Sequence, residues 1–92
     1  MIWTWDEDKN QANQQTHRLG FESAQLVFND PLSLSRRDPS PLETRWQTMG
    51  MIGHVVVFVV HTWPDNEEQP GRIISARKAT AHERRAYESR GF

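Results

Sequence analysis

The sequence predicts an α+β fold in which helices pack on a four- to five-stranded, mostly antiparallel sheet. Two helical segments come first, strand-like segments follow at short spacing, and a capped helix ends the chain. The 92 residues are 36% hydrophobic and 25% charged, which is typical of a small globular unit and too apolar for a disordered chain. No repeat, linker or low-complexity tract divides the sequence, so we expect a single domain over residues 1–92.

The N-terminal third predicts one short strand and two helices. Residues 1–5 alternate weakly between apolar and polar side chains, as a short edge strand does. Asp6 is a candidate N-cap for a helix over residues 7–18, because acidic side chains follow it in the first turn. A second helix with an apolar stripe starts near Phe21 and ends at Asp30-Pro31.

The remainder predicts four strands and a final helix. The strands are expected at residues 32–37, 45–51, 54–62 and 72–77. The third of them holds an unbroken Val-rich run, which indicates burial on both faces and a central place in the sheet. Thr80-Ala81-His82-Glu83 matches the capping box, so a helix should run from there to about Ser89, with Gly91 beyond its end. We expect the helices to cover one face of the sheet.

Charge is unevenly distributed along the chain. Residues 1–70 carry five cations against ten carboxylates, a net −5, and residues 71–92 carry six cations against two carboxylates, a net +4, which together give the overall −1. The sequence therefore predicts a local cationic face that acts at short range, without long-range steering of an anionic partner.

Several features narrow the classes of protein. The chain has no Cys, which excludes disulfides and thiolate metal sites and fits a reducing cytoplasm. The first residues lack a basic segment followed by an apolar one, so no signal peptide is expected. The longest apolar run, residues 55–60, is too short to span a bilayer, and we expect a cytoplasmic protein with no membrane partner.

A series of short motifs carries a resemblance to a known family. It includes Trp5-Asp6, Phe21-Glu22, Arg45-Trp46 and His61-Thr62, and it is densest from Arg72 through Thr80. In this order the motifs are similar to those of the BrnT family of ribonuclease toxins. One departure is Thr16-His17-Arg18, which stands where the family usually has Lys-His-Gly.

The resemblance implies a fold and a function. The fold would be related to that of the RelE ribonucleases. The chain would be an endoribonuclease toxin of a type II toxin–antitoxin system that cleaves RNA without a metal or other cofactor and so blocks translation. A BrnA-like antitoxin with a DNA-binding domain would neutralise it, and operator DNA would be contacted only through that antitoxin. The alternative is a non-catalytic scaffold that partners a DNA-binding repressor.

Metal-free RNA cleavage requires a base for the ribose 2′-OH, cations for the phosphoryl oxygens and an acid for the leaving 5′-oxygen. Arginine suits the second role, and Arg72 and Arg77 are the first candidates. Strand alternation places them on opposite faces unless the strand bulges, and we favour Arg77 because it ends the strand. His61, expected at the rim of the central strand, is a candidate acid, base or phosphate contact, or a hydrogen-bonded strand-end residue.

Other residues are weaker candidates for the same site. Arg45 and Glu43 flank a strand start and supply either a cation and a carboxylate or a surface ion pair. Tyr87, on the final helix, donates a proton, stacks on a base or packs in the core. We expect RNA contacts from the basic residues Lys9, Lys78, Arg84 and Arg85. The polar helix face with Lys9, Asn13 and His17 is a second basic cluster or a solvated surface. No metal site is expected, because the four histidines lack ligand spacing.

Overall fold

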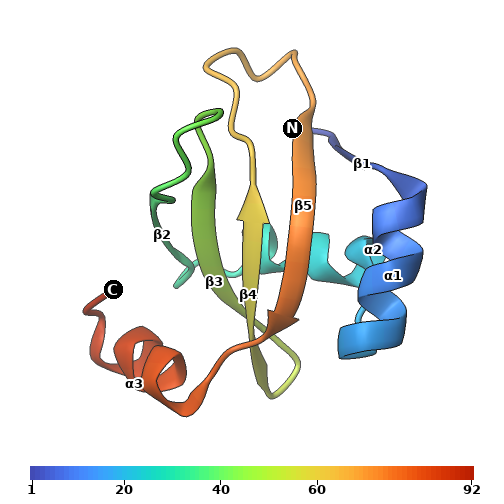
Figure 1. Cartoon of the computed structure of the whole chain (residues 1–92). Coiled ribbons are helices and arrows are strands. Elements are labelled where there is room, and N and C mark those ends of the chain that lie inside the picture. Colours follow the sequence, from blue (N-terminus) through green and yellow to red (C-terminus); the bar gives the residue numbers. More distant parts are fainter.

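The computed structural model describes residues 1–92 and has the predicted order of elements (Figure 1). The elements are β1 (Trp3–Trp5), α1 (Glu7–His17), α2 (Phe21–Ala24), the 3₁₀ helix η1 (Gln25–Asn29), β2 (Leu34–Arg37), β3 (Trp46–Ile52), β4 (Val55–His61), β5 (Gly71–Lys78) and α3 (Ala81–Ser89). The predicted α+β class is confirmed. The second predicted helix is shorter than expected, because α2 changes into a 3₁₀ helix after one turn.

The five strands form one mixed sheet in the order β1-β5-β4-β3-β2. Only the β1–β5 pair is parallel, and the other three pairs are antiparallel. β4 lies in the middle, as its Val-rich run predicted, and residues 56–59 of it are buried. β1 is an edge strand, which is also as predicted.

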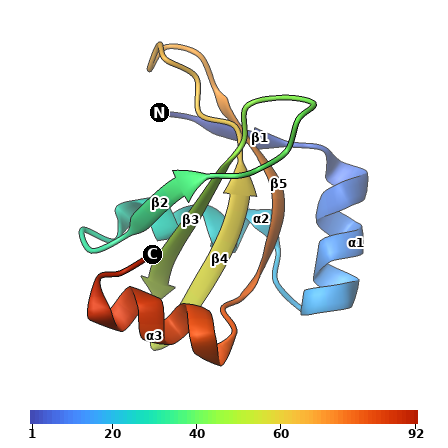
Figure 2. The same cartoon turned by 60° about the vertical axis from the view of Figure 1, so that its left-hand side comes forward.

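The helices cover both faces of the sheet, so the expectation that they share one face is wrong. Phe21, Ala24 and Val27, from α2 and η1, pack against one face together with Val57 and Val59. Tyr87 of α3 packs against the opposite face in a second core cluster. Figure 2 shows α3 in front of the lower strands and α2 behind them. A central strand that is apolar on both sides needs a covering layer on each, and α3 is the only element left for the second face.

Two asparagines attach α1 to the rest of the fold. The helix has almost no apolar residues, yet Asn10 and Asn13 are buried. Asn13 Nδ2 donates to the carbonyl of Ala76 at 2.7 Å, and the Ala76 amide donates back to Asn13 Oδ1 at 3.3 Å. Asn10 Oδ1 accepts from the amide of Phe21 at 2.8 Å. Because β1 pairs only with residues 71–73 of β5, Asn13 satisfies backbone groups on the strand edge that β1 leaves open.

Both long helices end on an arginine in the left-handed conformation. Arg18 follows α1 with φ 55°, and Arg90 follows α3 with φ 63°. Glycine adopts this conformation without the steric cost that a Cβ brings, so both ends store some strain. The expected place of Gly91 beyond α3 is confirmed, but Arg90 takes the capping position before it. No helix in the structure is long and apolar enough to cross a membrane.

Candidate functional site

A β-bulge in β5 decides which arginines share a face of the sheet. The β4–β5 register shifts near one end of the pair, so that Ile74 is an extra residue. As a result Ile73 and Ala76, although three residues apart, both lie in the core under α2. Arg72 and Arg77 therefore both project to the opposite face, the one that carries α3. Regular strand alternation predicts that Arg72 and Arg77 lie on opposite faces, and the bulge is the reason that they share one face.

Four arginines lie on this second face beyond the part that α3 covers, and we call Arg36, Arg45, Arg72 and Arg77 the arginine face. The Arg77 guanidinium stacks over the Phe58 ring at 4.3 Å, and that of Arg36 stacks over Phe92 at 4.2 Å. Phe58 belongs to the core cluster around Tyr87 and Phe92 packs against that cluster, which fixes the side of the sheet on which Arg77 and Arg36 lie. The sequence had not singled out Arg36.

Glu43 joins two members of the arginine face. Its Oε1 accepts from Arg45 Nε at 3.0 Å and from Arg72 Nη2 at 2.6 Å, so one oxygen atom lies between two guanidinium groups. The hydrogen bond from Arg45, with the nearby charge of Arg72, lowers the pKa of the Glu43 carboxyl below 4.5. A carboxylate of this kind is a weak base. It occupies a place that suits a phosphate oxygen.

Arg77 is held in a defined position by Glu83. Its Nη1 and Nη2 donate to the two oxygens of Glu83 at 2.7 and 3.0 Å. This hydrogen bonding lowers the pKa of Glu83 to about 2 and raises that of Arg77. Glu83 also accepts from the Thr80 amide at 2.9 Å and completes the capping box of α3, as predicted. The N-terminus of α3 thus fixes the direction of the Arg77 side chain.

Next to Arg77 lies a hollow of about 460 Å³ where α1 ends and α3 begins. Its walls hold His17, Arg18, Arg77 and Lys78 together with the hydroxyls of two threonines, and they include no acidic residue. We call it the cationic hollow. An adjoining depression shares His17 and adds Lys9. The cationic hollow thus brings one imidazole together with three cationic side chains.

The residues of the cationic hollow were only partly foreseen. Lys9 and Lys78 had been expected to contact RNA, and both adjoin His17. His17 itself had been assigned only to a polar helix face, and Arg18 to no site. A signal was nevertheless present, because these two residues occupy the position of the family's Lys-His-Gly motif.

His61 does not lie at a rim, and that expectation is wrong. Its side chain is fully buried on the face opposite the arginine face, with Trp3 and Phe28 at its edges. Nδ1 lies 2.9 Å from the Thr62 carbonyl and Nε2 lies 2.6 Å from Thr48 Oγ1. Burial disfavours the imidazolium and lowers the pKa of His61 to about 4. The structure therefore does not bring His61 together with Arg45 and Arg77.

Tyr87 is also buried, at 6% exposure, beneath the part of α3 that packs on the sheet. Its hydroxyl donates to Asp30 Oδ2, and this bond raises the pKa of Tyr87. Burial alone would raise the pKa of Asp30, but the hydrogen bonds from Tyr87 and from the Met51 amide lower it. The tyrosine thus ties α3 to the turn before β2. Of the three roles considered for Tyr87, this arrangement corresponds to packing in the core.

The two remaining predicted RNA contacts lie apart from the cationic hollow. Arg84 faces Glu88 on the exposed side of α3 at 3.9 Å, and Arg85 lies in a shallow depression with His82. No group of three or more His, Asp or Glu side chains in the structure is placed to hold a metal ion.

A small α+β protein with arginines and lysines gathered around one histidine has the chemistry of a phosphate-binding protein. The family comparison is more specific. The model for the ribonuclease toxin BrnT of type II toxin–antitoxin systems matches residues 5–83. The chain therefore belongs to the BrnT family, which confirms the resemblance read from its motifs. No match was found among curated proteins. Family membership supports ribonuclease activity and implies an antitoxin partner.

Proposed function

We propose that this chain is a metal-independent endoribonuclease that cleaves RNA in the cationic hollow. The observation that carries the proposal is the convergence of His17, Arg18, Arg77 and Lys78 around a space of about 460 Å³. The cations supply charge neutralisation for a phosphoryl group, and the imidazole supplies a group for proton transfer.

The cleavage step uses the 2′-OH of the RNA itself. The 2′-oxygen attacks the neighbouring phosphorus and loses its proton to a base, the P–O5′ bond breaks, and the 5′-oxygen gains a proton. The products are a 2′,3′-cyclic phosphate and a 5′-hydroxyl. We assign one proton transfer to His17, because it is the one imidazole that lines the hollow. Arg77 and Lys78 neutralise the charge that develops on the phosphoryl oxygens.

The arginine face supports the binding of RNA that flanks the cleaved bond. Arg72 and Arg77 lie five residues apart on one strand, which corresponds to roughly 15 Å. A single-stranded segment that passes the cationic hollow would meet Arg72 and Arg45 further along the same face. Its phosphates would replace Glu43 between these two arginines, since Glu43 is partly exposed. His61 and Tyr87 act in this proposal through packing and hydrogen bonding only.

Cleavage of messenger RNA would block translation, and the toxin would be held inactive by an antitoxin. We propose a BrnA-like antitoxin with a DNA-binding domain, so that operator DNA is contacted by the antitoxin alone. The support for this part is the family match over residues 5–83.

The decisive test is RNA cleavage by the purified chain in the presence of EDTA. We expect His17→Ala and Arg77→Ala to reduce the cleavage rate by about 100-fold or more, since each removes a group that acts in the transition state. His54→Ala is the matched control, because His54 lies in the exposed β3–β4 turn. RNA with 2′-O-methyl groups should not be cleaved. Circular dichroism confirms that each variant is folded.

The alternative function, a scaffold for a DNA-binding repressor, has one observation in its favour. Arg45, Arg72 and Arg77 are already paired with Glu43 or Glu83 in the free chain. A folded wild-type chain that binds its antitoxin but never cleaves RNA would establish the scaffold and refute the enzyme.

A further inference from the structure

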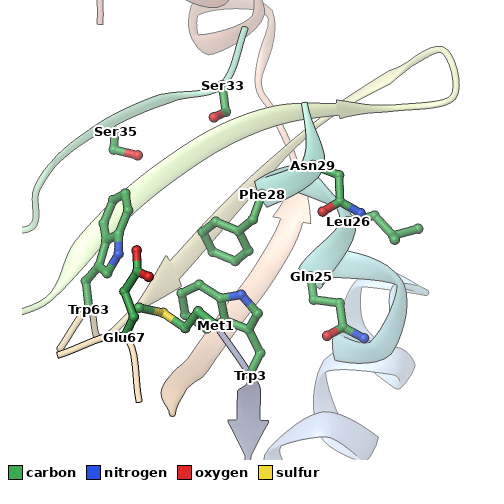
Figure 3. A pocket seen from close by; sticks show the side chains of 10 residues that line it. All are labelled: Met1, Trp3, Gln25, Leu26, Phe28, Asn29, Ser33, Ser35, Trp63 and Glu67. Carbon is green, nitrogen blue, oxygen red and sulfur yellow. The ribbon is translucent and has the colours of Figure 1, made fainter. Parts of the chain in front are cut away.

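A second hollow lies on the other face of the sheet, away from the arginine face. It has a volume of about 430 Å³ and opens between η1, the start of β2 and the loop over residues 62–70 (Figure 3). The Trp3 and Phe28 rings stack in it with centroids 3.9 Å apart. Trp63 lines its other side and is 41% exposed. We call it the aromatic pocket.

The hydroxyl of Ser35, which β2 contributes to this pocket, can only accept a hydrogen bond from an occupant. His61 Nδ1 must carry the ring proton, because it faces the Thr62 carbonyl at 2.9 Å, so Nε2 accepts from Thr48 Oγ1. Thr48 then has no proton left for Ser35 Oγ, which lies 2.7 Å away and therefore donates to Thr48. Ser35 lines the aromatic pocket, and toward an occupant it acts as a hydrogen-bond acceptor.

Among the side chains that line the aromatic pocket, only one is charged, and it is a carboxylate. Glu67 lines it beside Trp63, and Figure 3 shows both side chains on the same side of the Trp3 and Phe28 rings. Asp65 and Glu68 flank Glu67 in the loop, and none of the three forms an ion pair. No Lys or Arg occurs in the sequence between Arg45 and Arg72. The side chains that line the pocket therefore favour a cation over a phosphate.

The edge of the pocket is apolar and accessible. Met1 is 47% exposed and Leu26 is 45% exposed, and both line the hollow. Apolar side chains that flank a cation would contact these residues, while the cation itself would lie against indole rings and a carboxylate. Indole faces attract guanidinium groups, and a carboxylate with a hydroxyl acceptor matches the donors of a guanidinium.

We propose that the aromatic pocket binds an arginine side chain, flanked by apolar residues, from a partner protein. The arginine donates to Glu67 and Ser35 and stacks against Trp63, and its apolar neighbours pack on Met1 and Leu26. For the partner's identity the proposal rests on the proposed function, in which the chain has an antitoxin. The pocket and the arginine face lie on opposite sides of the sheet, so the anchoring arginine and the RNA would contact different residues.

The test uses a defined peptide and the full chain. N-acetyl-Leu-Arg-Leu-amide is titrated into ¹⁵N-labelled protein, and the indole N–H signals of Trp3 and Trp63 are followed by NMR. The control peptide has citrulline in place of arginine, which keeps the shape and removes the charge. We expect the arginine peptide to shift both indole signals. The citrulline peptide should bind at least about tenfold more weakly than the arginine peptide.

Two variants of the loop give a matched comparison. Glu67→Gln should weaken binding of the arginine peptide about tenfold, because Glu67 lines the pocket. Glu68→Gln removes the same charge one residue away, outside the pocket, and should change the affinity less than twofold. Equal losses in both variants, equal affinity for both peptides, or no shift of the indole signals at millimolar peptide would each overturn the proposal.

The partner is tested separately with the cognate antitoxin. We expect Glu67→Gln, but not Glu68→Gln, to weaken that complex. An unchanged complex in a variant that no longer binds the peptide would refute the assignment of the partner. Cleavage of RNA by the wild-type chain is an independent measurement. Peptide binding without cleavage would reject only the ribonuclease proposal, and cleavage without peptide binding would reject only the arginine pocket.

Discussion

Replacing Glu83 by glutamine separates the ionic role of this side chain from its role in capping α3. Glu83 accepts two hydrogen bonds from Arg77, at 2.7 and 3.0 Å, and one from the Thr80 amide at 2.9 Å. Glutamine also serves at this position of a capping box, so Glu83→Gln keeps the Thr80 contact and removes only the charge. The loss in stability then measures the pair with Arg77.

The size of the effect follows from the pKa of Glu83, which hydrogen bonds from Arg77 and, to a smaller extent, from Thr80 lower from 4.5 to about 2. At about 1.4 kcal/mol per pKa unit, this lowering sets an upper bound of about 3.5 kcal/mol. The Arg77 side chain is 35% exposed and that of Glu83 is 15% exposed, so solvent and salt screen the pair. We expect Glu83→Gln to lower the free energy of unfolding by about 1–2 kcal/mol at pH 7.

The pH dependence has a definite sign. The pKa of Glu83 is lower in the folded chain than in the unfolded one, so its contribution is complete above pH 4.5 and disappears as the pH falls toward about 2. Urea unfolding, followed by tryptophan fluorescence at pH values from 7 to 3, measures this contribution. The difference in free energy of unfolding between the wild type and Glu83→Gln should fall by more than half as the pH drops below 5.

A matched control lies on the same helix. Glu88 faces Arg84 across 3.9 Å with both side chains more than half exposed, and Glu88→Gln should leave the stability unchanged within error. If Glu83→Gln unfolds at the same urea concentration as the wild type at pH 7, or if its deficit persists undiminished at pH 3, the interpretation of the Arg77–Glu83 pair is refuted.

Three further substitutions test other features of the fold by the same urea assay. Arg18→Gly should stabilise the chain by about 1 kcal/mol, since Arg18 has a φ of 55° that glycine adopts freely; destabilisation would contradict the strain. Asn13→Ala should cost about 2–4 kcal/mol, because it leaves the amide and carbonyl of Ala76 without partners at the edge of β5, and a neutral result would show that water replaces the asparagine. Gly50→Ala should cost about 1–3 kcal/mol, because the new Cβ would lie 2.6 Å from the Val27 carbonyl oxygen; an unchanged midpoint would show that η1 can move away.

The elements that local chemistry controls were predicted well. The capping box Thr80–Glu83 starts α3 as expected, and the Val-rich run of β4 lies at the centre of the sheet. Both are local signals, since a cap uses backbone groups three residues away and an apolar run needs burial wherever it lies. The second helix was predicted too long, because its apolar stripe does not distinguish an α-helix from the 3₁₀ turns of η1.

The candidate site was predicted less completely. Arg77, Lys78 and Lys9 had been selected from the sequence, and they adjoin the cationic hollow. His61 had been expected to be accessible, yet the ring of Trp3 and the segment after β4 enclose it. Spacing along one strand shows the side to which a side chain points, but it does not show what distant segments place over it.

By itself, the sequence determined the α+β class, the order of the strands and helices along the chain, the caps of α1 and α3 and the basic character of the C-terminal segment. Its motifs also identified the BrnT family. These properties depend on residues that are neighbours in the chain or on the pattern of the whole sequence.

The tertiary structure alone decided where the side chains of the candidate site come together. The extra residue Ile74 in β5 turns Arg72 and Arg77 to one face, and Asn13 binds α1 to the edge of β5, so that His17 comes to lie beside Arg77 and Lys78. A bulge depends on the pairing of two strands, and the docking of a polar helix depends on backbone groups that another strand leaves free. Neither is a property of one segment, and for that physical reason neither could be read from the sequence.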